Sequence, residues 1–112
     1  MSGTQLHERR CVPCEKGTPP LTPREVEPLL AQLEGWKVEE ERGHQQLVKR
    51  FRFKNFVEAV DFVNRLTPVA EAEGHHPDLE VAWGLVEVRL WTHAAGGLTE
   101  NDFVLGAKID RL

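Results

Sequence analysis

The sequence has no long hydrophobic run. No apolar stretch in its 112 residues approaches the roughly 20 residues that a helix needs to cross a bilayer. The first ten residues, MSGTQLHERR, also lack the apolar segment of a secretion signal. We therefore expect a cytoplasmic protein that has no contact with a membrane.

The sequence also has no excess of positive charge. Its 14 lysine and arginine residues are mixed along the chain with 18 aspartate and glutamate residues, and the formal net charge is −4. Such a chain lacks the basic surface that attracts a nucleic-acid backbone, so we expect no nucleic-acid partner. A phosphate-binding loop is missing too, because residues 94–97, AAGG, are too short and lack the lysine pattern of such loops.

Cysteine is scarce, and the two cysteines, Cys11 and Cys14, form the motif Cys-Val-Pro-Cys. This spacing occurs in redox motifs and in half of many zinc sites, which stay open as alternatives. A redox pair of the thioredoxin type opens a helix after a strand, whereas this one leads into the loop-forming residues 17–20. A structural zinc usually takes four ligands, and His7 is the only further one nearby. We expect residues 1–21 to form an N-terminal extension whose cysteines pack or stay free thiols.

The remaining residues, 22–112, have the composition of one globular domain. Hydrophobic residues make up 40% of the chain and charged residues 29%, which fits a single modest core. Capping patterns predict three helices. These are residues 22–34, which begin with Thr22, Pro23 and Glu25; residues 55–74, which begin with Asn55 and Glu58; and a last helix that begins with Thr99 and Asp102.

Apolar spacing predicts which faces of these helices are buried. In the last helix, residues 102, 105, 109 and 112 lie along one stripe. Pro68 removes a backbone donor from the long helix, so we expect a bend or a local break about one turn before His75. The apolar face of the long helix is expected at Phe56, Ala59, Val60, Val63 and Ala70.

Two antiparallel hairpins separate the helices. Their order predicts an α+β domain of two layers, with a four-stranded antiparallel sheet and helices on one face, in the order α-β-β-α-β-β-α. Open sheet edges favour self-association, so we expect a homo-oligomer, either a dimer or a tetramer. The first hairpin has Trp36, Val38, Leu47, Phe51 and Phe53 around a turn at residues 42–44, and the second has Leu79, Val81, Trp83, Val86, Val88 and Leu90 around Gly84.

Three histidines belong to the two ends of the second hairpin. His75 and His76 precede Pro77, and His93 follows the last strand. Because antiparallel pairing returns the second strand to the start of the first, we expect the three imidazoles to converge. Pro77 favours an extended His76, so the two neighbouring side chains should point apart.

Two carboxylates accompany the histidines. Glu71 lies four residues before His75 and shares its face if the last helical turn persists. Asp102 lies in the first turn of the last helix, where it can close the same cleft. Imidazole has an unperturbed pKa of about 6.5, so near neutral pH one histidine can hold a proton while another lacks one. Elimination of water needs that combination of acid and base, and no nucleophile stands out in the sequence.

The spacing of seven residues resembles the signature of the pterin-4a-carbinolamine dehydratase family. In this sequence the pattern is Glu71, three residues, His75-His76-Pro77, five residues, Trp83, nine residues, His93, eight residues, Asp102. The order of elements is similar to the family's over residues 22–112. The resemblance implies a hydro-lyase of tetrahydrobiopterin metabolism that converts 4a-hydroxytetrahydropterin to quinonoid dihydropterin without a metal or an organic cofactor.

The resemblance also implies roles for these residues. His75 and His93 exchange protons with the 4a-hydroxyl and with N5 of the pterin, and His76 orients or polarises the ring. Glu71 and Asp102 hold histidine tautomers or bind the polar edges of the ring. Pro77 and Trp83 complete the expected substrate-binding set, with packing as the alternative for Trp83.

Other functions stay open alongside the dehydratase. One is a pterin-binding or regulatory protein without turnover, since vertebrate members of the family also bind a homeodomain transcription factor. Another is a role in a molybdopterin-linked pathway. The third is a metalloprotein that uses Glu71, His75 and His93, which are chemically suitable ligands.

Overall fold

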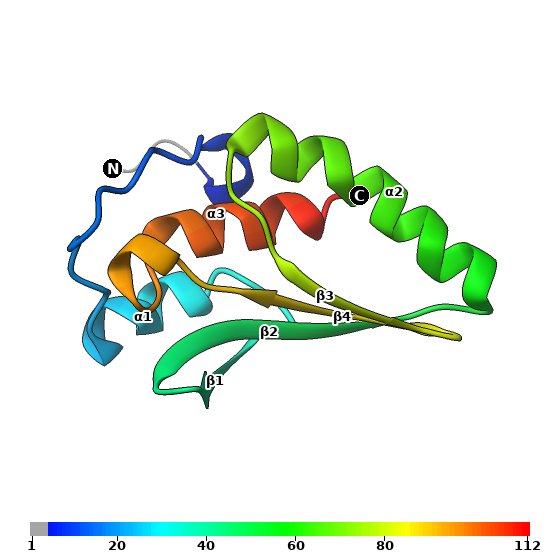
Figure 1. The fold of residues 1–112 in the computed structure, drawn as a ribbon, viewed down its shortest axis with the longest axis horizontal. Helices are drawn as coiled ribbons and strands as arrows, with labels where there is room; N and C mark the ends of the chain where they lie inside the picture. The colour runs from blue at the N-terminus through cyan, green and yellow to red at the C-terminus, as the bar shows by residue number, and fades with distance from the viewer. Residues whose placement is uncertain (1–4) are drawn as a thin grey trace.

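The computed structural model describes residues 5–112, and residues 1–4 of the predicted extension lie outside this range. The strands form one antiparallel sheet in the order β1-β2-β4-β3, and α2 and α3 lie over one of its faces (Figure 1). The predicted α+β architecture and its element order are confirmed. The elements are η1 (Leu6–Glu8), α1 (Pro23–Leu30), β1 (Lys37–Glu41), β2 (His44–Arg52), α2 (Phe56–Glu73), β3 (Asp78–Ala82), β4 (Leu85–Leu90), η2 (His93–Ala95) and α3 (Glu100–Ile109).

The first helix begins as predicted and ends earlier. The Thr22 side chain accepts a hydrogen bond from the Glu25 backbone, and the Glu25 carboxylate accepts one from the Thr22 N–H at 2.9 Å. The helix was predicted to continue over residues 31–34, and this is wrong, because α1 ends at Leu30. The Gln32 N–H bonds to the carbonyl three residues before it, so tight turns replace the α-helical bonds there.

The second helix, α2, is continuous over 18 residues. Asn55 caps it as predicted, since its side chain accepts a hydrogen bond from the Glu58 N–H at 2.9 Å. Of the bend or local break predicted at Pro68, the break is wrong, because the helix continues through this residue. Leu66 and Ala70, on either side of Pro68, are buried in the core and hold this turn in place.

The buried face of α2 is rotated from the predicted one. Phe56 and Val60 were expected in the core, but they are 51% and 36% exposed. Apolar residues occur on more than one side of this helix, so its spacing alone does not decide which side meets the sheet. The buried stripe consists of Ala59, Phe62, Leu66 and Ala70.

The two hairpins form as predicted. The first turns at Arg42 and Gly43, whose φ angles of 54° and 84° are the left-handed pair that a two-residue hairpin turn requires. β2 pairs with β4 across the centre of the sheet, for example Leu47 with Leu90. Trp83 was predicted on a strand and instead lies in the β3–β4 turn, where it is 71% exposed.

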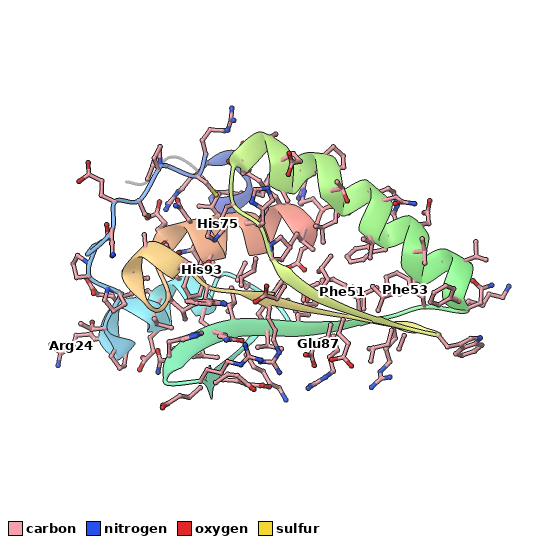
Figure 2. The ribbon with its side chains drawn as sticks, viewed as in Figure 1. Arg24, Phe51, Phe53, His75, Glu87 and His93 are labelled. Atoms are coloured by element: carbon pink, nitrogen blue, oxygen red, sulfur yellow. The ribbon has the colours of Figure 1, made fainter. Side chains whose placement is uncertain are left out.

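The core lies between the sheet and the helices. Phe51 and Phe53 point toward α2, whereas Glu87 lies on the opposite, polar face of the sheet (Figure 2). Residues 102, 105 and 109 of the stripe predicted for the last helix are buried as expected, whereas Leu112 lies beyond the end of α3 and is 38% exposed. The burial extends beyond this stripe to nearly all sides of α3. Its neighbours include α1, α2 and the N-terminal turn η1, whose Leu6 joins the core. Helix α3 is therefore the central element of the domain.

Candidate active site

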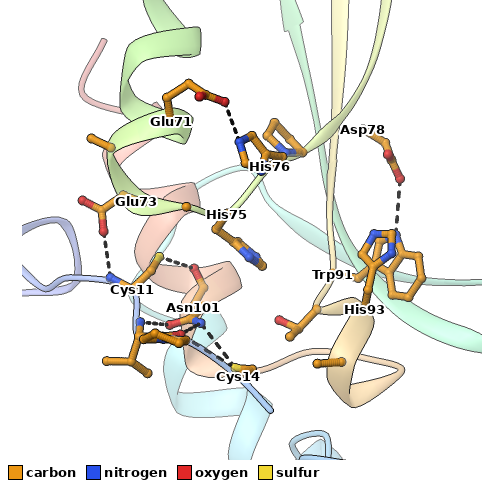
Figure 3. Close-up of a pocket in the computed structure, with 17 residues that line it drawn as sticks. Cys11, Cys14, Glu71, Glu73, His75, His76, Asp78, Trp91, His93 and Asn101 are labelled. Carbon is orange, nitrogen blue, oxygen red and sulfur yellow. Dashed lines mark hydrogen bonds and ion pairs between the residues drawn. The ribbon is translucent and has the colours of Figure 1, made fainter. Parts of the chain in front are cut away.

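A cavity of about 710 Å³ lies where the end of α2, the segment after β4 and the N-terminal segment meet. Its lining comes from residues 11–14, 71–78 and 91–94 and from Asn101. His75, His76 and His93 all line it, so the structure brings together the three histidines that the sequence analysis selected (Figure 3). The volume lies within the range of about 300–1,000 Å³ that is usual for small-molecule sites.

The end of α2 sets the direction of the histidine pair. Gly74 ends the helix in a left-handed conformation, with φ of 64°, and the His75 N–H bonds back to the Ala70 carbonyl at 3.3 Å. This arrangement is a common helix terminus and places the next residues in a defined direction. The two side chains then point apart, as predicted from Pro77 (Figure 3). His75 bonds to Asp102, whereas His76 bonds to Glu71.

His75 is held by a buried carboxylate. Its Nε2 lies 2.6 Å from Oδ1 of Asp102, which is fully buried, and only 12% of the His75 side chain is exposed. The other carboxylate oxygen, Oδ2, accepts hydrogen bonds from the Thr92 hydroxyl and the Thr99 N–H, both at 2.9 Å. Asp102 therefore has a fixed orientation and fixes the imidazole in turn. Among the described residues, the second ring nitrogen of His75, Nδ1, has no partner.

His76 forms a second pair at the rim of the cavity. Its Nε2 lies 2.6 Å from Oε2 of Glu71, and both side chains are largely exposed. The sequence placed Glu71 on the face of His75, but the carboxylate bonds to His76 instead. An exposed pair of this kind contributes little to stability, so its geometry is more relevant to a ligand than to the fold.

His93 lies in the short turn η2 and is held by stacking. Its ring lies 3.7 Å from the Trp91 ring, with an angle of 16° between the planes, and His44 stacks on Trp91 at the same distance, 3.7 Å. The Trp91 Nε1–H donates a hydrogen bond to Asp78 at 3.3 Å. His93 is thereby presented on an aromatic platform across the cavity from His75 (Figure 3).

Sequence reasoning missed several lining residues. Trp91 is not among the predicted site residues, although it lies two residues before His93, and this spacing on extended backbone puts both side chains on one side. The segment Cys11–Cys14 was assigned to an extension outside the domain, and no local signal indicates that it reaches the cavity. Both cysteines are free thiols.

The remaining predicted residues differ in their distance from the cavity. Pro77 lines the cavity beside the histidines. Asp102 lies behind His75 rather than in the lining. Trp83 lies in the β3–β4 turn, at the opposite end of the hairpin from the cavity, and a substrate contact for it stays a prediction.

The donor groups of the described chain do not form a metal site. Residues 5–112 contain no group of three histidine, cysteine, aspartate or glutamate side chains placed to hold an ion. Glu71 and His75, proposed as ligands in the metalloprotein alternative, are each bonded to a different partner. The same residues contain no helix long and apolar enough to span a bilayer.

The chain is similar to known proteins over almost its whole length. Residues 19–112 match the profile of the family described as Pterin 4 alpha carbinolamine dehydratase. A protein of Rickettsia canadensis, named "Putative pterin-4-alpha-carbinolamine dehydratase", is 51% identical over 96% of each chain.

Two solved structures are similar to this one. A transcriptional coactivator/pterin dehydratase from Brucella melitensis is 33% identical with a TM-score of 0.74, covering 82% of this chain and 96% of its own. A pterin dehydratase-like protein, identified as a RuBisCO assembly factor in the alpha-carboxysome, is 24% identical with a TM-score of 0.58. It covers 70% of this chain and 88% of its own, and this likeness shows the fold alone.

Proposed function

The chain belongs to the pterin-4a-carbinolamine dehydratase family, and we propose that it removes water from 4a-hydroxytetrahydropterin to give quinonoid dihydropterin. In this step the C4a–O bond breaks, and the hydroxyl leaves as water after it receives a proton. The N5–H proton is lost, and its electron pair forms the C4a=N5 double bond. Protons and electrons balance without an oxidant or a reductant.

The observation that supports this proposal best is the presence of imidazoles on two walls of one cavity. His75 is fixed by Asp102 at 2.6 Å, and His93 is fixed by its stack on Trp91. Rings held in this way can exchange protons with neighbouring atoms of a flat ligand, one as acid and the other as base. We assign the 4a-hydroxyl and N5 to this pair of histidines.

The other residues have supporting roles in the proposal. His76, with Glu71 beside it, orients or polarises the pterin from the rim. Asp102 holds His75 in one tautomer: if the Nε2–H donates to the carboxylate, the free Nδ1 is left to accept a proton from the ligand. Pro77, which lines the cavity next to His76 in the sequence, contributes to the substrate-binding wall.

The proposal includes the setting of the reaction. We place the enzyme among the hydro-lyases of tetrahydropterin recycling, with residues 22–112 as the catalytic domain and a pterin as its small-molecule partner. We expect it to act in the cytoplasm, as a dimer or a tetramer.

A stopped-flow dehydration assay on the purified protein tests this function. The absorbance of freshly generated 4a-hydroxytetrahydropterin should disappear faster with protein than in buffer. His75→Ala and His93→Ala should each lower kcat by about 100-fold or more, because general acid and base groups contribute factors of this size. His7→Ala, a matched change away from the cavity, should retain the wild-type rate.

The alternatives predict different outcomes in this assay. A wild-type protein that binds the pterin but leaves the decay at the buffer rate would indicate a binding or regulatory protein. Full activity of both His75→Ala and His93→Ala would show that these histidines are not catalytic. Circular dichroism of each variant checks that the fold is retained.

A further inference from the structure

The N-terminal segment forms one wall of the histidine cavity. Residues Cys11–Cys14 run past the end of α2 and the start of α3 and face the side on which His75 and His93 lie (Figure 3). The family profile begins only at residue 19, so this wall lies outside the part of the chain that matches it. We refer to residues 11–14 as the leader wall.

Asn101 clamps the backbone of the leader wall. Its Oδ1 accepts a hydrogen bond from the Val12 N–H at 2.9 Å, and its Nδ2 donates one to the Val12 carbonyl at 2.6 Å. A side-chain amide that satisfies both backbone groups of one residue fixes the position of that residue. Asn101 itself is buried, so its amide is held by the fold while Val12 remains exposed.

Glu73 provides the second attachment. The Cys11 N–H donates a hydrogen bond to Oε1 of Glu73 at 2.7 Å, and Oε2 lies 3.0 Å from Nε of Arg10 and 3.6 Å from Nζ of Lys108. Only 6% of the Glu73 side chain is exposed. A buried carboxylate with a backbone donor and two cations is well satisfied, so this contact is a stable anchor.

Both anchors lie next to the proposed catalytic residues in the sequence. Glu73 is two residues before His75, and Asn101 immediately precedes Asp102. The two helix ends that orient the His75–Asp102 pair therefore also set the position of the leader wall. The wall is thus attached to the same two helix ends as the His75–Asp102 pair.

We propose that the leader wall contacts the bound pterin and raises its affinity, and that Asn101 is the positioning residue that holds the wall in place. This rests on the proposed function, since it deepens the assignment of the same cavity. Val12 and Pro13 offer apolar carbon atoms, which suit the face of a flat ring. The wall supplies contact area rather than proton transfer.

The chemistry of Cys11 fits a structural role in the leader wall. Burial and the neighbouring Glu73 carboxylate raise the pKa of the Cys11 thiol to about 12. Cys11 is thus a protonated thiol at neutral pH, and its Sγ donates toward the Asn101 carbonyl at 3.5 Å. It reinforces the clamp and does not act as a nucleophile.

Kinetics of Asn101→Ala test the positioning role. The variant should raise KM about tenfold and change kcat by less than about twofold, because it removes contacts made equally in the ground state and the transition state. Asn64→Ala, the same change at an exposed position of α2, should leave both constants unchanged. An unchanged KM for a folded Asn101→Ala protein would overturn the proposal.

A thiol footprint on the wild-type protein tests contact directly, even if the variant does not fold. Cys14 is alkylated with iodoacetamide in the presence and absence of 7,8-dihydrobiopterin, and the modification is located by mass spectrometry. Saturating pterin should slow the alkylation of Cys14 about tenfold or more, as contact would shield the thiol. Turnover without this protection overturns the leader wall, whereas protection without turnover supports the wall and contradicts the dehydratase. If the protein shows neither turnover nor protection of Cys14, both the proposed function and the leader-wall proposal are overturned.

Discussion

The carboxylate of Asp102 lies 2.6 Å from Nε2 of His75, although 27 residues separate the two in the sequence. The same carboxylate accepts the Thr99 N–H and so caps α3. One buried side chain thus begins the central helix and orients a histidine of the cavity. The stability of α3 and the geometry of the proposed active site are therefore linked through a single residue.

Asp102→Asn should separate these two roles. An amide that presents its NH₂ group to Nε2 favours the other tautomer of His75, so kcat should fall about 100-fold while KM changes little. The free energy of unfolding should fall by about 1–3 kcal/mol, since buried hydrogen bonds are weakened. Steady-state dehydration kinetics and thermal melts measure both effects. Asp61→Asn, on the exposed side of α2, is the matched control, and a kcat within threefold of wild type would contradict the assignment.

Glu73→Gln should change how stability depends on pH. Burial alone raises the pKa of Glu73, but the hydrogen bond from the Cys11 backbone and the charges of Lys108 and Arg10 outweigh it and lower the pKa below the ordinary 4.5. A lowered folded-state pKa contributes stability above the ordinary value, and this contribution is lost as the pH falls through the folded pKa. The free energy of unfolding of the wild type should therefore exceed that of the variant by about 1–2 kcal/mol at pH 7 and by less under acidic conditions.

Urea unfolding at neutral pH and at several acidic pH values measures this difference. Glu80→Gln replaces an exposed glutamate on β3 and provides the matched control. Its difference in unfolding free energy from the wild type should not change with pH. A difference between wild type and Glu73→Gln that stays constant over this range would show that the anchor does not depend on the carboxylate charge.

Trp91→Leu should release His93 from its platform. The stack at 3.7 Å holds the His93 ring, and a leucine cannot provide a flat face for it. We expect kcat/KM to fall about tenfold, since a poorly held catalytic ring spends less time in the reactive geometry. Phe56→Leu, which shortens an exposed aromatic residue of α2, should retain activity. Equal activity of Trp91→Leu and wild type would assign the stack to packing alone.

Two glycine substitutions should have opposite effects on stability. At Gly106, inside α3, an added Cβ would lie 3.5 Å from Leu47 and Trp36, an ordinary contact, so Gly106→Ala should stabilise the fold by about 0.5–1 kcal/mol. At Gly84 the Cβ would lie 2.8 Å from the Phe53 carbonyl oxygen, so Gly84→Ala should destabilise it by about 1–3 kcal/mol. Thermal melts of both variants check the two signs.

Local signals in the sequence predicted the elements well where the relevant interactions are local. The caps at Thr22, Asn55 and Thr99 each involve a residue three positions away, and all three begin helices as expected. Predictions that depended on the surroundings were less accurate. Phe56 is exposed and α3 is buried on almost every side, because packing between elements decides which apolar residues are covered.

The order of the elements, the hairpin that returns His93 toward His75 and the spacing that indicates the family could all be predicted from the sequence alone. These follow from backbone geometry and short-range hydrogen bonds, which neighbouring residues specify. Three features are visible only in the folded chain: Asp102 holds His75, Glu71 holds His76, and the segment 11–14 lines the cavity. Such contacts join residues up to 90 positions apart, and they depend on the depth and angle at which the helices pack on the sheet.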